Sequence, residues 1–586
     1  MKLFFPSPIR STFQPSPFAG QILRTGNILG PQESPNKMIE RVVCSLCAAE
    51  RFFHTSDRET RQFSQDLLSC LDNKECVMST PIMHNAGRYS KKPLAACSVP
   101  PLDLNSSYKE IENVVNAFHR NGMGTGFSLN NVADPIPVLK ALNRIAVAGA
   151  KSGREDRPVG NMAVISIYHP RVMDVINIKI GADERGEEWK FNISIDVDEQ
   201  FFRALEKDGL ICLQDGTRVR ARSLFTDIAN AAYRCGDPGL VFLDRLNADN
   251  PTPKVGLYTS VAPCGEVGLM PGETCQFGYI NLGKCISSFP EPSINLSKIE
   301  HLTKLMVRAL DNALELSGRQ FSLEVNRNVM RAKRKIGVGI CGLADMLIAL
   351  RIPYASEKGV RVATDVVAFI NYISKQESHK LARTRGSFGA MDDPGSRYTE
   401  HPGFIEQKYG SLETRYVSKT MWQNLGVQIR TTQHLRNSIT ISLPPTGRSG
   451  LIIDASTGVE PLFSLINPDG NIYAPLLRDL QSNNISPNSF AELKRNGSLR
   501  ALTGIPETLR FLYRTALEIN PEQHIAMVSG LQRVVDDSIS KTINLPSNSS
   551  PDYIARLFLR AYQLNLKGIT VFRDGCRFIQ PREVSR

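Results

Sequence analysis

Short apolar runs alternate with longer helical stretches from about Met78 almost to the end of this chain. The short runs are rich in β-branched residues and are typical of strands: "MAVISIY", "FNISIDV", "GLVFL", "ITISL" and "GLIIDAS". The longer stretches repeat apolar residues at helical spacing: "TKLMVRALDNALEL", "GLADMLIALRI" and "VATDVVAFINYISK". Alternation of this kind over about 500 residues predicts one large α/β core.

The regions outside this core have a different composition. Residues 1–21 contain four prolines within the first twenty positions, which predicts a flexible arm and opposes the amphipathic helix of a transit peptide. Residues 22–77 include "MIERVVCSLCAAERFF", a helical pattern, and predict a helical N-terminal region. The core then spans residues 78–577, and residues 578–586 form a short tail.

The charge and cysteine content narrow the classes of protein. The formal net charge of +12 is spread along the 586 residues and not gathered in a tail, which argues against a nucleic-acid-binding segment. Such a surface attracts nucleotide phosphates or simply maintains solubility. No apolar run is long enough to cross a membrane. The twelve cysteines lack the dense spacing of secreted scaffolds, so we expect a reducing cytoplasm.

Two motifs are better explained by packing than by chemistry. Cys44 and Cys47 lie three apart in a helical pattern, and we interpret them as buried small side chains and not as a redox pair. The run "GVGICG" at 337–342 fits the dinucleotide-binding spacing, but "RAKRK" precedes it in place of an apolar strand, so close packing of helices explains its glycines better. The nine histidines are scattered, and no metal site is predicted.

The segment "SVAPCGEVGLMPGETCQFGYINLG", residues 260–283, concentrates the chemistry. Cys264 stands between Pro263 and Gly265, Glu266 follows two positions later, and Cys275 comes eleven residues after Cys264. In an extended segment the thiol and the carboxylate would point the same way, as a radical or nucleophilic cysteine with an adjacent base requires. Spacing alone also fits a buried cysteine in a turn.

Several segments, in order, resemble the ribonucleotide reductase family. The segment around Cys264 is similar to its N-P-C-G-E…C-N-L-G-S-I-N-L signature, with the cysteine spacing of the adenosylcobalamin-dependent class. The resemblance covers roughly residues 20–577. Its other segments are "STPIMHNAG" (79–87), "AACSV" (95–99), "GMGTGFSL" (122–129), "CGDPGLVFLDRLNADNPTP" (235–253), "RKIGVGICGLADMLIALRIPY" (334–354), "LPPTGRSGLIIDASTGVEPLF" (443–463) and "KGITVFRDGCR" (567–577).

This resemblance implies a fold and a set of roles. The fold is a ten-stranded α/β barrel made of two antiparallel halves of parallel strands, with a finger loop that carries the radical cysteine, Cys264. Cys97 and Cys275 would be the redox pair and Glu266 the base acting on the 3′-hydroxyl of a ribonucleotide. The residues implied to bind substrate are Thr80, Ala96, Cys97, Ala262, Cys264, Pro445, Thr446, Gly447, Arg448 and Ser449.

The implied cofactor is adenosylcobalamin. The iron-dependent class passes its radical through two adjacent tyrosines, and the matching segment here, "GITVFRDG", has none. A cofactor must supply the radical because closed-shell side chains cannot perform this reduction. The implied substrate is a ribonucleoside di- or triphosphate, and a nucleotide effector and a homodimer fit the family.

The sequence also departs from the family at several positions. Ala262 replaces an asparagine that holds substrate hydroxyls, and Arg448 replaces a small or hydroxylated residue. The short tail lacks the usual cysteine pair, so we expect an external thioredoxin-like dithiol or a tail from a second chain as reductant, unless the reaction consumes no thiols at all. Arg154 and Arg157 lie in the place of an effector-reading loop and could meet phosphates, although a solvated charged loop fits equally.

These departures leave two further hypotheses beside ribonucleotide reduction. One is a diverged radical enzyme that eliminates or rearranges at C2′ of a nucleotide. The other is a non-catalytic, nucleotide-binding paralogue, which the retained Cys97, Cys264, Glu266 and Cys275 oppose because binding alone needs no thiols.

Overall fold

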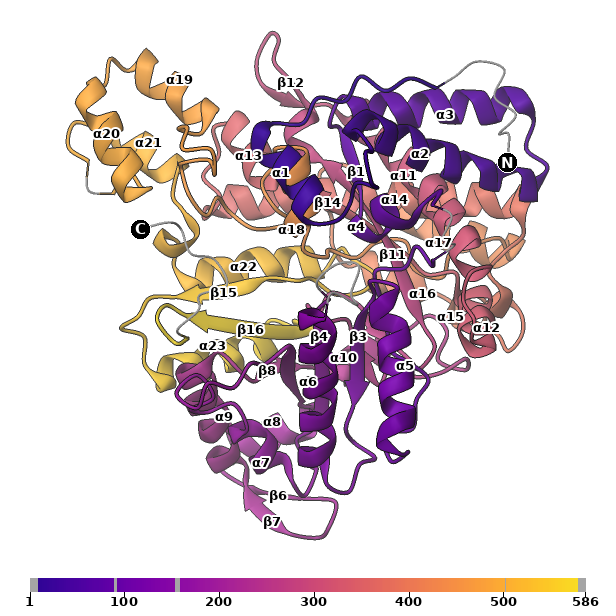
Figure 1. Ribbon diagram of the computed structural model, residues 1–586, viewed down its shortest axis with the longest axis vertical. Helices are drawn as coiled ribbons and strands as arrows, with labels where there is room; N and C mark the ends of the chain where they lie inside the picture. Colours follow the sequence, from indigo (N-terminus) through magenta and orange to yellow (C-terminus); the bar gives the residue numbers. More distant parts are fainter. Residues whose placement is uncertain (1–8, 89–91, 153–158, 501, 578–586) are drawn as a thin grey trace.

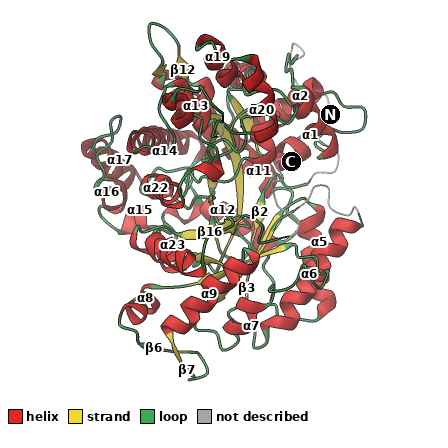
Figure 2. Cartoon of the chain, turned by 90° about the vertical axis from the view of Figure 1, so that its left-hand side faces the viewer, coloured by secondary structure: helices red, strands yellow, loops and turns green. Residues whose placement is uncertain are grey.

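The computed structural model describes residues 9–88, 92–152, 159–500 and 502–577 (Figure 1). Strands run through the middle of this part of the molecule and helices surround them (Figure 2). The apolar core is continuous from Phe13 near the N-terminus to Val571 in the last strand. No helix in the described ranges is long and apolar enough to cross a membrane.

One half of the central sheet consists of five neighbouring strands that all run parallel. Parallel strands covered by helices need apolar side chains on both faces, and the buried runs of β4 and β5 provide them. The five strands are β2 (Cys97–Ser98), β3 (Gly124–Ser128), β4 (Asn161–Ser166), β5 (Phe191–Asp196) and β8 (Gly239–Val241).

The other half is also parallel. Strand β11 pairs with β14 and strand β15 with β16, while residues 439–443 bridge the two pairs through Val338↔Ile441 and Leu443↔Ile539. The bounds are β11 (Thr274–Asn281), β14 (Ile336–Cys341), β15 (Thr542–Leu545) and β16 (Gly568–Arg573).

The two halves meet antiparallel at both edges, where β16 pairs with β8 and β11 pairs with β2. The ten segments therefore close into a ring of two antiparallel halves, which confirms the predicted barrel. Strand β1 (Cys76–Met78) adds antiparallel to the far part of β11. The small hairpins are β6 (Leu210–Cys212) with β7 (Arg218–Arg220), β9 (Ser260–Val261) with β10 (Gly268–Leu269), and β12 (Ile286–Ser287) with β13 (Ser293–Ile294).

Two long helices cover β11 and β14. Helix α11 (Leu296–Gly318) begins at the Asn295 cap and packs on both strands and on α14 (Glu357–Arg385). A side chain at Gly278 of β11 would begin 2.3 Å from the sulfur of Met306, so the glycine lets α11 approach the sheet closely.

The remaining helices connect or flank the strands (Figures 1 and 2). In the order of the chain they are α4 (Thr80–Asn85), α5 (Tyr108–Arg120), α6 (Pro135–Lys151), α7 (Val172–Asn177), α8 (Glu199–Glu206), α9 (Ala221–Cys235), α10 (Leu243–Ala248), α12 (Glu324–Lys333), α13 (Leu343–Ala349), α15 (Arg397–Glu400), α16 (Phe404–Tyr409), α17 (Lys419–Thr432), α18 (Gly447–Ile452), α22 (Pro521–Gln532) and α23 (Pro551–Gln563), with 3-10 turns at Leu282–Lys284, Gly389–Met391 and Ala516–Glu518.

The N-terminal region is helical as predicted, but the expected flexible arm is wrong for residues 11–21. Ser11 donates to Asp72, Phe13 is fully buried, and α1 begins at Pro17 after the Ser16 cap. These contacts tie the segment to the helices that follow it. They are α1 (Pro17–Thr25), α2 (Pro35–Ala48), the 3-10 turn Ala49–Phe53 and α3 (Asp57–Asp72).

A peripheral lobe of three helices stands apart from the barrel at the upper left of Figure 1. Helices α19 (Ala474–Ser482), α20 (Pro487–Asn496) and α21 (Glu507–Leu512) share a separate small core that includes Leu476 and Leu480. The sequence pattern did not distinguish this lobe from the main core.

Two sequence interpretations are corrected in detail. The run "GLIIDAS" is not a strand, because helix α18 occupies residues 447–452 and buries Ser449 and Ile452, three apart. The first two glycines of "GVGICG" lie in β14 itself, where side chains at Gly337 and Gly339 would collide with the rings of Phe277 and Tyr279. They make room for aromatic rings inside the barrel and not for packed helices.

Candidate active site

Cys264 lies at the tip of a hairpin inside the barrel. Strands β9 and β10 form its stem, and β9 lies against β3 and β4. The Ala262 N–H donates to the Val267 carbonyl at 2.9 Å, and the Gly265 N–H donates to the Ala262 carbonyl at 2.8 Å. This tight turn, with Gly265 at φ 75°, leaves the Cys264 side chain exposed at the tip.

Glycines in the neighbouring strands make room for this hairpin. A side chain at Gly126 would begin 2.3 Å from the Val261 carbonyl oxygen, and one at Gly124 would begin 2.9 Å from the Pro263 ring. Cβ atoms do not make contacts of this length, so only glycine allows β3 to run so close to the hairpin. The glycine-rich segment 122–129 thus has a structural function beside Cys264.

Glu266 is buried beneath the tip, 2% exposed, whereas Cys264 is exposed. The expectation that both side chains point the same way depended on an extended segment, and a turn replaces that segment. Burial raises the pKa of its carboxyl to about 7, with a smaller contribution from Asp537, although the backbone N–H groups of Glu266 and Cys264 oppose the rise. Among the described residues its Oε2 has no hydrogen-bond partner.

Cys97 and Cys275 face each other across the antiparallel pair β2–β11. Directly opposed residues in such strands have Cα atoms about 4.5–5.5 Å apart, within the range that a disulfide spans. Both cysteines are in the thiol form, and burial raises the pKa of Cys275 well above its usual value. Sγ of Cys97 would lie 3.3 Å from a side chain at Gly124, so the pair borders the strand that accommodates the hairpin.

The residues expected to bind phosphate lie at the starts of two short helices. Thr80 is the first residue of α4, after Ser79, whose buried hydroxyl lacks a partner among the described residues. Thr446 precedes α18, and its hydroxyl accepts from the Gly458 N–H at 2.9 Å. Helix α18 packs against β1, the strand that leads into α4, so the two helix starts belong to one region.

Other expected substrate residues differ in their surroundings. Nη1 of Arg448 would lie 3.6 Å from a side chain at Gly26, so the guanidinium reaches the C-terminal end of α1. Ala262 is fully buried and Ala96 nearly so. Arg154 and Arg157, and the tail 578–586, lie outside the described residues.

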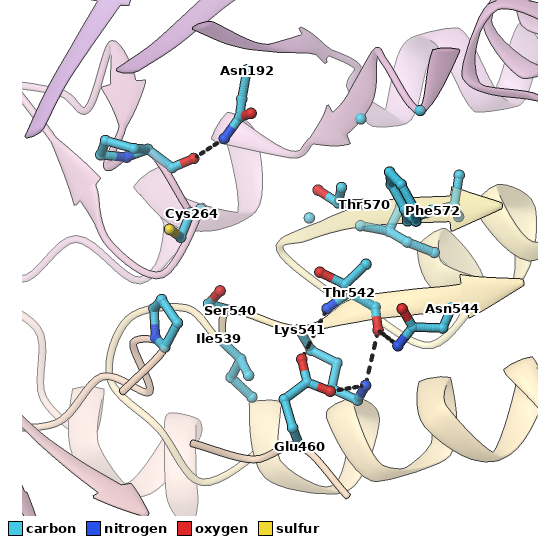
Figure 3. Close-up of a pocket in the computed structure, with 18 of the residues that line it drawn as sticks. Asn192, Cys264, Glu460, Ile539, Ser540, Lys541, Thr542, Asn544, Thr570 and Phe572 are labelled. Atoms are coloured by element: carbon cyan, nitrogen blue, oxygen red, sulfur yellow. Dashed lines mark hydrogen bonds and ion pairs between the residues drawn. The ribbon is translucent and has the colours of Figure 1, made fainter. Parts of the chain in front are cut away.

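A cavity of about 380 Å³ opens beside Cys264 (Figure 3). Of the predicted residues, Cys264, Pro445 and Gly447 line it. Its far wall comes from β15 and β16 and the segments before them, where Lys541 pairs with Glu460 at 2.5 Å. Further polar and aromatic side chains on this wall are Ser540, Thr542, Asn544, Thr570 and Phe572, and Asn192 of β5 lines the opposite side beside Cys264.

Sequence reasoning missed these lining residues. The only available signal was the close match of "KGITVFRDGCR" to family sequences, to which no binding role was assigned. Asn192 carried no signal, because it lies about seventy residues from Cys264 along the chain.

The chain thus forms a closed α/β barrel with a cysteine on an internal hairpin and a facing thiol pair in its wall. The family described as "Ribonucleotide reductase, barrel domain" matches residues 123–572. The chain belongs to the ribonucleotide reductase family.

Individual relatives agree with this assignment. The chain is 30% identical to the vitamin B12-dependent ribonucleoside-diphosphate reductase of Mycobacterium tuberculosis over 93% of its own length and 77% of the relative's. It is also 30% identical to the enzyme of the same name from Thermoplasma acidophilum, over 88% and 65%. The solved class Id ribonucleotide reductase alpha subunit of Actinobacillus ureae has the same fold, with a TM-score of 0.75, 16% identity and coverage of 97% and 98%.

Proposed function

We propose that this protein reduces ribonucleotides to 2′-deoxyribonucleotides with a thiyl radical at Cys264. The observation that carries the proposal is the placement of Cys264 at the tip of a hairpin inside the barrel, above the buried Glu266. The thiyl takes the 3′-hydrogen of the ribose and returns it at the end. The facing thiols Cys97 and Cys275 supply two electrons and two protons, so that the 2′-hydroxyl leaves as water and a disulfide remains.

Glu266 has the properties of the base for the 3′-hydroxyl. A general base works best with a pKa near the working pH, and burial places the pKa of Glu266 at about 7. Its Oε2 is an acceptor without a partner among the described residues, which a substrate hydroxyl would satisfy. The alternatives of elimination and of simple nucleotide binding receive no specific support from this arrangement.

Adenosylcobalamin is the cofactor we propose, and when bound it supplies the radical. The cavity beside Cys264 has the size of sites for nucleoside-sized groups, which span about 300–1,000 Å³. Its wall combines an aromatic ring, Phe572, with hydroxyl and amide groups of Thr542, Asn544 and Thr570, as the apolar base and polar sugar of an adenosyl group require. The vitamin B12-dependent names of the relatives support the same choice.

The substrate we propose is a ribonucleoside diphosphate, the substrate named for the relatives at 30% identity. Its phosphates would meet the starts of α4 and α18, around Ser79, Thr80 and residues 446–449, as the family resemblance implies. Arg448 would contribute less than the sequence suggests, because it reaches towards α1.

The reductant and assembly belong to the same proposal. An external dithiol protein, or a tail from a second chain, would reopen the disulfide. A nucleotide effector and a homodimer belong to this proposal, and a reducing cytoplasm fits an enzyme whose twelve cysteines are in the thiol form.

Product analysis tests the proposal. Purified protein is incubated with adenosylcobalamin, a dithiol and each ribonucleoside di- and triphosphate, and the products are separated. We expect 2′-deoxynucleotide from the diphosphates, dependent on the cofactor. Release of free base or a rearranged sugar would support the elimination hypothesis, and nucleotide binding without any product would overturn the enzymatic proposal.

A further inference from the structure

Residues 260–269, which form the hairpin that carries Cys264, are here called the finger hairpin. Its tip is held by Asn192, a residue of β5. Its Nδ2 donates to the Pro263 carbonyl at 2.8 Å, and the dashed line in Figure 3 marks this bond. The Pro263 carbonyl belongs to the peptide that directly precedes Cys264. Because this hydrogen bond fixes that peptide, it sets the direction in which the Cys264 thiol leaves the backbone.

The stem of the hairpin is held by a buried ion pair at Gly268. The Gly268 N–H donates to Oδ1 of Asp537 at 2.8 Å, and Nζ of Lys335 donates to the Gly268 carbonyl at 2.7 Å. The ammonium and carboxylate lie 3.2 Å apart, and each side chain is 1% exposed. One ion pair therefore grips both backbone groups of one hairpin residue.

A third contact joins the same segment to the base. The Ser538 N–H, next to Asp537, donates to the backbone carbonyl of Glu266 at 3.1 Å. Residues 537–538 thus hold Glu266 and Gly268 together, while Asn192 holds the tip from β5, in the other half of the barrel. The reacting thiol and the base have separate anchors, neither of which involves a ligand.

The charges of this anchor are balanced inside the barrel. Lys335 also pairs with Glu273 at 3.1 Å, and Lys333 pairs with Glu273 at 2.9 Å. Burial alone would lower the pKa of Lys335, but the carboxylates of Asp537 and Glu273 raise it well above its usual value, so the ammonium stays charged. Buried ion pairs add little stability compared with apolar residues of similar size, but hydrogen bonds to charged groups are strong and directional. The pair of Lys335 and Asp537 is therefore better suited to fixing the position of Gly268 than to stabilising the fold.

We propose that Asn192, Lys335 and Asp537 are positioning residues that fix the finger hairpin before any nucleotide or cofactor binds. They act through the backbone, by holding Cys264 and Glu266 at constant places relative to the facing thiols. This inference rests on the proposed function only in taking Cys264 and Glu266 as the reacting groups.

Amide hydrogen exchange of the protein without cofactor tests the anchors directly. The variant Asn192→Leu keeps the approximate size of the side chain and removes the donor, and Lys335→Met removes the ammonium. We expect exchange in residues 260–269 to become faster in both. In turnover assays kcat should fall by about ten- to a hundredfold with little change in the KM for nucleotide, because misplaced reacting groups slow the chemistry more than binding.

A matched variant separates anchoring from general loss of stability. Lys375→Met removes another lysine that is fully buried, whose Nζ pairs with Asp536 at 2.7 Å and does not touch the hairpin. It should lower the unfolding temperature without faster exchange in residues 260–269. The Asn192 side chain faces the cavity, so Asn192→Leu should leave the core intact. The proposal is wrong if this variant changes neither kcat nor the exchange of residues 260–269.

The pH dependence of turnover gives a second readout. In Asp537→Asn the Oδ1 acceptor for Gly268 remains, but the negative charge near Glu266 is gone, so the pKa of Glu266 should fall. The acid limb of kcat/KM should then move to lower pH. An unmoved limb would show that Asp537 has no influence on the base. Hydrogen exchange needs no substrate, so an absence of deoxynucleotide product would overturn the proposed function and leave the anchoring result standing.

Discussion

Glu266 combines burial, a raised pKa and an oxygen without a partner among the described residues. A carboxyl with no role in binding or catalysis would destabilise the fold in such a place, because its backbone hydrogen bonds compensate only part of its desolvation. A substrate hydroxyl would satisfy the free oxygen, and the raised pKa keeps the group able to accept and release a proton near neutrality.

The rate should therefore follow the ionisation of Glu266. Only the carboxylate accepts a proton, so kcat/KM should fall about tenfold for each pH unit below a pKa of about 7 and level off above it. Glu266→Gln should lower the rate by about 10²- to 10⁴-fold and flatten this limb. A pH–rate series on both proteins measures this, and an acid limb that persists in Glu266→Gln would assign it to another group.

The relation between Cys264 and Glu266 also shows a limit of reasoning from spacing. Both residues were identified from the sequence, but the extended segment assumed between them was wrong. Alternation of side chains holds for an extended strand, and the hydrogen bond from Gly265 to Ala262 makes the segment a turn. Burial of one residue and exposure of the other follow from that turn.

At the scale of elements, β3 and the finger hairpin fit closely together. A methyl group at Gly126 would begin 2.3 Å from the Val261 carbonyl, so Gly126→Ala should displace the hairpin or the strand. We expect a large loss of kcat from displacements of even about 1 Å, which can cost about a hundredfold. Gly318→Ala is the control, because a methyl group there meets no atom within 4 Å. Equal activities for the two variants would contradict the close fit.

Asp311 of α11 binds three arginines that come from separate parts of the chain. It accepts hydrogen bonds from Arg334, Arg385 and Arg436, and all four side chains are buried. Burial would raise the pKa of Asp311, but the three guanidinium groups hold it well below its usual value. The carboxylate is therefore charged over the whole physiological range.

Asp311→Asn should be strongly destabilising, because it leaves three buried cations with one anion fewer. Removing one member of a buried ion cluster costs about 3–5 kcal/mol, to be measured by urea unfolding. Glu300→Gln on the same helix removes an exposed pair with Lys304 and should change the stability by about 0–1 kcal/mol. Similar losses in the two variants would show that the cluster adds nothing beyond surface charge.

At the scale of the whole molecule, the alternation of strands and helices was enough to predict an α/β core, and the family resemblance predicted the closed barrel. The positions of β4, β5, α11 and α14 agree with the runs from which they were predicted. These elements are long and strongly patterned, so local sequence determines them.

The remaining features depend on contacts between distant segments. Residues 439–443 close the barrel through two isolated bridges. The first residues of "GLIIDAS" belong to helix α18, which packs against α1 and β1, and both of these come from a distant part of the sequence. Asn192, Lys335 and Asp537 reach one hairpin from three separate parts of the chain. No pattern within a single segment contains that information.

The central claim is that the Cys264 sulfur carries the radical that meets the sugar. Rapid-freeze electron paramagnetic resonance of the protein with adenosylcobalamin and a ribonucleoside diphosphate tests it most directly, in protein containing ordinary or β-deuterated cysteine and in Cys264→Ser. We predict a coupled cobalt–thiyl signal that narrows with deuterated cysteine and is absent from Cys264→Ser. An unchanged signal in Cys264→Ser would place the radical elsewhere and contradict the account.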